Sequence, residues 1–132
     1  MSRRSARKNA FILLFQMEFN EEYEELKEMF FEEKEDPVSE EDKAFILAAV
    51  DGVKEHQTEI DALIDSFAKG WDTERMNRVD LAILRLAVYE MRYSQDTPVG
   101  VAINEAVEMA KKFSSDEAPA FINGILGKIA SA

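Results

Sequence analysis

The sequence predicts an all-α protein of six or seven helices, and three observations support this prediction. Apolar residues recur every three or four positions through most of the 132-residue chain, which is the period of an amphipathic helix. Residues that start helices precede these tracts, and strand signals are nearly absent. The length suits one domain, or two small halves that share a core, and a hydrophobic content of 46% is enough to fill that core.

Helix start signals and breakers define the elements in order. The predicted helices cover residues 2–19, 21–33, 39–67, 77–93, 98–113 and 119–130. The first begins at a serine cap, Ser2 or Ser5, and Pro37 follows the end of the second. Ser39 and the acids after it resemble a capping box with an acidic first turn. That third tract is one long helix or two helices with a break near Gly52–His56.

Apolar faces at helical spacing support the first and the central helix most clearly. The predicted inward residues are Ala6, Ala10, Leu13, Leu14 and Met17 in the first helix, and Val79, Ala82, Ile83, Leu86, Tyr89 and Tyr93 in the helix over 77–93. Phe11 and Phe15 are also expected in the core, with stacking on nucleic-acid bases as the alternative role. Pro98 and Pro119 stand near the first position of the last two helices, where proline is favoured.

Two local patterns lead to specific packing expectations. Gly70-Trp71-Asp72 predicts a turn, in which Trp71 anchors the core. Asn123-Gly124 is a hairpin signal in isolation, but the flanking residues do not alternate in polarity. We therefore expect a helix there, with Gly124 allowing close approach of a second helix.

Charge is strongly segregated at the beginning of the chain. The net charge is −11, and segment 18–42 carries thirteen carboxylates and two lysines, so 2 − 13 = −11 accounts for all of it. The first ten residues contain Arg3, Arg4, Arg7 and Lys8 and no carboxylate. Cations at the start of a helix oppose the helix dipole, so a local rule is broken there. A basic surface on an acidic protein is typical of binding to an anionic partner such as a nucleic acid, whereas the acidic segment predicts a solvated face.

Several classes of chemistry find no support in the sequence. Without cysteine there is no disulfide, thiolate nucleophile or cysteine zinc site. His56 is the only histidine and has no partner that would complete a metal site, so we expect a structural role for it. Glycine-rich phosphate loops and serine-centred elbows are missing, which argues against an enzyme and against a cofactor. No apolar run approaches the roughly 18 residues of a membrane span, and we expect a cytoplasmic protein.

Blocks from both ends of the chain together resemble the NusB family of bacterial transcription antitermination factors. The resemblance is carried by Arg3–Ala10 with Leu13–Gln16, by Asn77–Met91, by Val101–Phe113 and by Phe121–Leu126, which occur in the family's order. It implies an all-α fold of two small helical bundles packed together, as a single NusB-like domain over residues 1–132. It also implies a non-enzymatic function: binding boxA RNA in ribosomal RNA leaders with NusE, a small-subunit ribosomal protein, so that the RNA polymerase antitermination complex reads through terminators.

The resemblance assigns roles to particular residues. RNA contacts fall to Arg3, Arg4, Arg7 and Lys8 at the N-terminus, and to Glu117 and Phe121 near the start of the last helix. Partner contacts fall to Glu74 and Asp80. The chain departs from the family pattern twice, because Phe15 stands where tyrosine is frequent and Glu117 where aspartate is common.

Two other functions remain open from the sequence. The chain could be a non-catalytic helical adaptor whose acidic segment is the working surface. It could also be a NusB-like RNA-binding module of a ribosomal-RNA methyltransferase, although no methyltransferase half or glycine-rich cofactor loop is present. Monomer and homodimer are equally compatible with the sequence.

Overall fold

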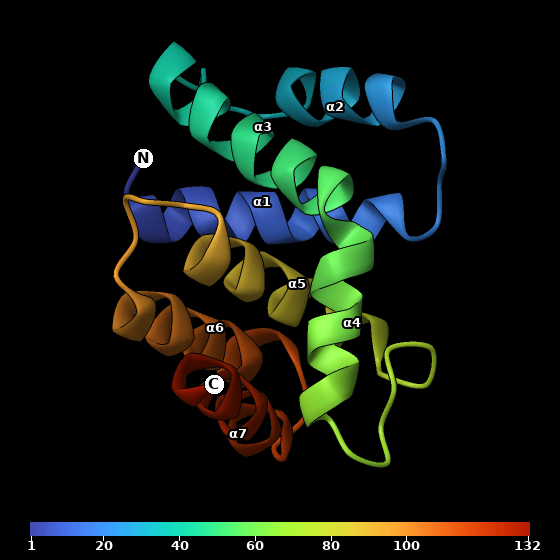
Figure 1. Ribbon diagram of the computed structural model, residues 1–132. Coiled ribbons are helices and arrows are strands. Elements are labelled where there is room, and N and C mark those ends of the chain that lie inside the picture. Colours follow the sequence, from blue (N-terminus) through green and yellow to red (C-terminus); the bar gives the residue numbers. More distant parts are fainter.

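The computed structural model describes all residues, 1–132, as seven α-helices without a strand (Figure 1). The helices are α1 (Arg3–Met17), α2 (Tyr23–Glu32), α3 (Glu40–Glu55), α4 (Gln57–Phe67), α5 (Arg78–Arg92), α6 (Val99–Phe113) and α7 (Ala118–Ser131). The all-α prediction is confirmed, and the tract over 39–67 is two helices. No helix of the chain combines the length and the apolar character that crossing a membrane requires.

The helices form two small bundles that share α5. Helices α1, α2 and α3 lie together on one side, and α4, α6 and α7 lie on the other (Figure 1). Helix α5 packs against α1 and α3 as well as against α4, α6 and α7. Ten of its fifteen residues are buried, as expected for a helix enclosed by neighbours on most sides. A side chain that α5 carries or binds is therefore fixed in position relative to both bundles.

Local signals start three of the helices at the expected places. The Ser2 hydroxyl accepts a hydrogen bond from the Ser5 backbone N–H at 3.0 Å, and the Ser39 hydroxyl accepts one from the N–H of Asp42 at 3.1 Å. The Asn77 side chain accepts from the N–H of Val79 at 2.7 Å. These bonds satisfy N–H groups that have no partner inside a helix.

The break between α3 and α4 falls at His56, whose imidazole has a packing role. Its backbone leaves helical geometry (φ −105°, ψ 15°), and its ring stacks on Tyr93 with centroids 3.9 Å apart. Tyr93, predicted to face inward, is partly exposed beside it. The close helix approach occurs at Gly52, where a Cβ would overlap the Tyr89 ring. The same expectation for Gly124 is wrong, because Gly124 is exposed and a Cβ there would contact nothing.

Aromatic residues divide between core and surface. Phe11 is buried as expected, and Phe15 is only partly covered although it packs against the core. Trp71 is 58% exposed, so the prediction that it anchors the core is wrong. It follows Gly70, whose φ of +85° forms a turn directly before it, and other apolar side chains, mostly aliphatic, fill the interior.

Candidate nucleic-acid interface

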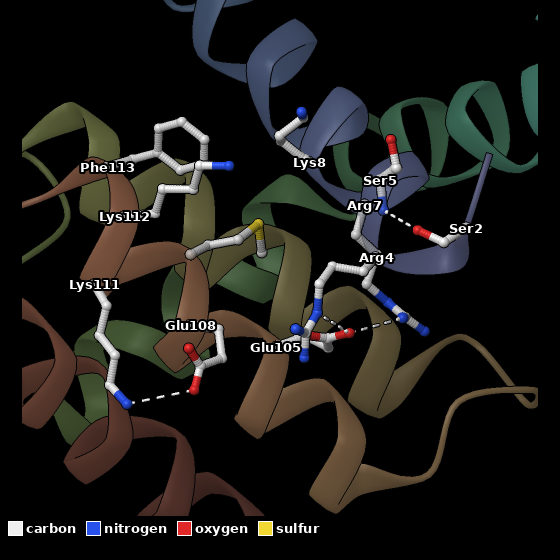
Figure 2. A pocket seen from close by; sticks show the side chains of 11 residues that line it. Ser2, Arg4, Ser5, Arg7, Lys8, Glu105, Glu108, Lys111, Lys112 and Phe113 are labelled. Carbon is white, nitrogen blue, oxygen red and sulfur yellow. Dashed lines mark hydrogen bonds and ion pairs between the residues drawn. The ribbon is translucent and has the colours of Figure 1, made fainter.

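The N-terminal turns of α1 and the C-terminal half of α6 enclose a groove of about 480 Å³ (Figure 2). Its lining residues are Ser2, Arg4, Ser5, Arg7, Lys8, Glu105, Glu108, Met109, Lys111, Lys112 and Phe113. Five of these are cations and two are carboxylates, a balance of 5 − 2 = +3 on a protein of net charge −11. The fold thus gathers positive charge from two segments about a hundred residues apart.

Two of the predicted cations line this groove in an accessible form. The Arg4 side chain is 67% exposed, and its Nε lies 3.0 Å from Glu105. Lys8 lines the groove from the next turn of α1 and makes no ion pair. Arg3 is exposed as well, but it lies against α3, with its guanidinium 4.2 Å from the centre of the Phe45 ring. Arg3 is therefore outside the groove that contains Arg4.

The expectation that Arg7 is an exposed cation is wrong. Arg7 is only 8% exposed, and its Nε donates to both carboxylate oxygens of Glu90, at 2.9 and 3.0 Å. It lies between the buried residues Ala6 and Asn9 on the face of α1 that meets α5, one turn before Phe11. Burial raises the pKa of Glu90, and the Arg7 guanidinium opposes that rise. Arg7 thus forms the floor beneath the groove and pairs with a buried acid.

Sequence reasoning missed the cations that α6 contributes. Lys111 and Lys112 end this helix and line the groove together with Phe113. Phe113 packs against Phe11 of α1, with ring centroids 5.2 Å apart, which joins the two walls. Cations in a last turn are favoured by the helix dipole alone, so nothing local marks these lysines as functional. Only their position opposite Arg4 and Lys8 does so.

A second hollow of about 330 Å³ lies where α6 leads into α7. Its lining residues are Trp71, Met76, Asn77, Asp80, Ser115, Glu117, Ala118 and Phe121. The structure therefore brings the predicted pair, Glu117 and Phe121, into one site. Glu117 is exposed, Phe121 is half-buried, and the exposed Trp71 adds a second aromatic face. Phe113 lines the groove and Ser115 lines this hollow, so the two sites adjoin along the chain.

The two residues assigned to a protein partner differ in accessibility. Glu74 is exposed in the connection between α4 and α5. Asp80 is buried, and its carboxylate accepts a hydrogen bond from the Ser114 hydroxyl. The expectation that Asp80 contacts a partner directly conflicts with this burial. Its carboxylate instead fixes the start of α5 to the end of α6, beneath the second hollow.

Arg78 links Glu74 to the end of α1, and exposed aromatic residues are close to both positions in the sequence. Arg78 donates a hydrogen bond to the Glu74 carbonyl and forms an ion pair at 3.5 Å with Glu18, which ends α1. The next residue after Glu18 is Phe19, which is exposed, and Trp71 lies in the same connection as Glu74. Exposed aromatic side chains beside charge are typical of protein contact surfaces.

The chemistry of the groove and of the second hollow together defines a class of protein. No three histidine, aspartate or glutamate side chains are close enough together to hold a metal ion. The groove presents amino and guanidinium groups suited to phosphates, and the adjoining hollow presents a carboxylate and aromatic faces suited to bases. This combination on an all-α scaffold is that of a helical nucleic-acid-binding protein.

Comparison with known proteins identifies the family. The family model described as "NusB family" matches residues 4–131. A transcription antitermination protein NusB from Agathobacter rectalis is 47% identical over 132 residues, which cover 98% of this chain and all of that protein. The NusB of Bacillus subtilis is 43% identical over 133 residues, covering 99% of this chain and 96% of that protein. The chain belongs to the NusB family.

Solved structures agree with this assignment. A structure of T. maritima NusB has a TM-score of 0.88 and 35% identity, and the match covers 99% of this chain and 92% of that one. A complex described as the antitermination factors NusB and NusE with dsRNA contains a chain with a TM-score of 0.87 and 28% identity, covering 98% of this chain and 96% of that chain.

Proposed function

We propose that this protein is an antitermination factor that binds boxA-type RNA in ribosomal RNA leaders together with a NusE-type ribosomal protein. The assembly would allow RNA polymerase to read through terminators. The observation that carries the proposal is the cationic groove of α1 and α6, which adjoins the hollow of Glu117 and Phe121 on an otherwise acidic molecule. The names of the relatives and the NusB–NusE complex with dsRNA support it.

In this proposal the groove holds phosphates and the hollow reads bases. Arg4, Lys8 and Lys112 carry the accessible positive charge, which fixes the strand without reading its sequence. Phe121 offers a ring on which an unpaired base can stack, and the Glu117 carboxylate can accept a hydrogen bond from an exocyclic amine. Arg3 adds a cation on the other side of α1, and Arg7 acts through its packing.

The proposed partner surface lies around Glu74 and includes the exposed Phe19, whose neighbour Glu18 pairs with Arg78. A net charge of −11 and a groove balance of only +3 predict weak RNA binding by the chain alone. A basic ribosomal protein docked on this surface would extend the positive field and screen the acidic segment. Asp80 supports this surface from beneath.

We further propose that residues 1–132 act as a single domain, because α5 is shared by both bundles. The role is binding and not catalysis, and the site of action is the cytoplasm, where ribosomal RNA is transcribed.

The test is a titration with labelled boxA-like RNA, a scrambled strand and a duplex, each with and without the ribosomal protein. About three to five neutralised phosphates on a single strand predict a log–log salt slope of roughly −2 to −3.5. The partner should strengthen binding of the boxA-like strand more than binding of the scrambled one. A slope of zero, or equal binding of both sequences by the pair, would contradict the proposal.

A further inference from the structure

One carboxylate is built into the cationic groove in a way that distinguishes it from the other acid there. Glu105 projects from α6 and its side chain is only 13% exposed, whereas the side chain of Glu108, one turn later, is 42% exposed and pairs with Lys111 of the same helix. Figure 2 shows Arg4 and Arg7 both directed from α1 toward Glu105. Glu105 is therefore a fixed negative charge at the centre of a surface that otherwise suits phosphate.

The charges around Glu105 divide into two pairs. Arg7 already has a counter-charge in the buried Glu90, and its distance to Glu105 is longer, 3.7 Å from Nη1 to Oε1. The Nε of Arg4 lies 3.0 and 3.3 Å from the two oxygens of Glu105. The charge that Glu105 neutralises is consequently that of Arg4.

The two members of this second pair differ in exposure. Glu105 is largely covered, while the Arg4 side chain is 67% exposed and bonded to it only through Nε. The terminal nitrogens of Arg4 are free to meet a phosphate, but the Glu105 carboxylate already contacts the same guanidinium at Nε. A phosphate that approaches Arg4 meets a neutralised cation and a like charge. Lys112 has no carboxylate within ion-pair distance.

We propose that Glu105 competes with RNA phosphate for Arg4 and thereby sets the specificity of the interface. This inference rests on the proposed RNA-binding function. By lowering the sequence-independent attraction of the groove, Glu105 makes stable binding depend on contacts at Glu117 and Phe121 that read bases. Specificity is a difference between two affinities, and a repulsive group that weakens binding of the wrong strand contributes to it.

The test compares Glu105→Gln with Glu108→Gln, which removes the same charge from the same helix and groove. Glutamine at 105 keeps an oxygen that can accept from Arg4 and removes the competing charge. Glu105→Gln should raise affinity for scrambled RNA by roughly three- to tenfold and raise affinity for boxA-like RNA less. Its salt slope on the scrambled strand should steepen by about 0.7, the effect of one further phosphate contact. Glu108→Gln should produce less than half of the affinity change.

Two further comparisons test the competition at Arg4, and the first of them does not depend on whether Glu105→Gln folds. Arg4→Ala should weaken scrambled-RNA binding less than Lys112→Ala does, because Glu105 already neutralises Arg4. In an Arg4→Ala background, Glu105→Gln should have no larger effect than Glu108→Gln. Equal losses for Arg4→Ala and Lys112→Ala, or a Glu105→Gln effect that persists without Arg4, would overturn the inference.

The outcomes also separate this inference from the proposed function. If the wild-type chain with its ribosomal partner binds neither RNA, the proposed function fails and the inference fails with it. If the wild type binds with the expected salt slope but Glu105→Gln leaves both affinities unchanged or lowers them, only the competition at Arg4 is refuted.

Discussion

Replacing Arg7 with alanine should destabilise the fold far more than replacing its neighbour Arg4. Arg7→Ala leaves the Glu90 carboxylate buried without the guanidinium that now lies 2.9 and 3.0 Å from its oxygens. Removing one partner of a buried ion pair costs about 3–5 kcal/mol. For a chain of this size that corresponds to a fall in melting temperature of about 10 °C or more. Arg4→Ala, at an exposed position, should change the free energy of unfolding by only about 0.5 kcal/mol.

The pH dependence of this effect has a definite sign. Burial raises the pKa of Glu90, and Arg7 opposes the rise, so its removal moves the folded-state pKa further above the unfolded value. A raised folded-state pKa contributes stability that is present below the unfolded pKa and is lost as the pH rises through the folded pKa. The free energy of unfolding of Arg7→Ala should therefore fall furthest below that of the wild type at neutral pH. Part of this loss should be regained as the pH falls toward the usual pKa range of glutamate.

The assay is thermal unfolding followed by circular dichroism from about pH 4.3, the ordinary pKa of glutamate, up to about pH 8. Adding Glu90→Gln to Arg7→Ala removes the unpaired charge, so it should restore at least half of the lost stability and flatten the pH dependence. A melting temperature for Arg7→Ala within about 2 °C of the wild type at pH 7 would show that the buried ion pair contributes little to stability. Failure of Glu90→Gln to rescue the variant would show that packing, and not charge, causes the loss.

Three further predictions concern recognition and packing. Phe121→Ala should weaken RNA binding by about 1–3 kcal/mol and reduce the preference for boxA-like over scrambled RNA, whereas a large fall in melting temperature with unchanged preference would assign the ring to the core. The NusE-type partner should raise RNA affinity at least tenfold, which corresponds to about 1.4 kcal/mol of reciprocal coupling. Calorimetry should show that Glu74→Lys weakens binding of the partner while the chain alone still binds RNA. Gly52→Ala should destabilise the protein by about 1–3 kcal/mol because the new Cβ would overlap a tyrosine ring. Gly124→Ala, where the Cβ would enter open space, should stabilise the protein by up to about 1 kcal/mol. Equal denaturation midpoints for the two variants would contradict this difference.

The helices could be predicted from sequence because their signals are local. Ser2, Ser39 and Asn77 each cap the helix that follows them, through bonds spanning two or three residues. The expectations about Trp71 and Gly124 were wrong because exposure depends on which helices pack together, and neither residue type determines that alone. In the core, α3 and α5 approach closely at Gly52, and no local signal distinguishes this glycine from the others.

The candidate site could be predicted only in part for the same reason. Arg4 and Lys8 are accessible cations as expected, but Arg7 and Asp80 are buried by contacts with residues 83 and 34 positions away. Helical spacing placed Arg7 near the other cations without showing that α5 covers its face. Lys112 lines the groove because α5 packs against both α1 and α6, so that Phe113 meets Phe11 and Glu105 meets Arg4, about a hundred residues apart in sequence.

We propose that RNA lies along the groove of α1 and α6 and reaches the hollow at the start of α7. A residue-by-residue NMR map of backbone amide shifts, recorded as boxA-like RNA is added, tests this path directly. We expect the largest changes at Arg4, Lys8, Lys112, Glu117 and Phe121, and none in the acidic helix α2. Changes confined to α2 and α3, with the groove residues unmoved, would contradict it.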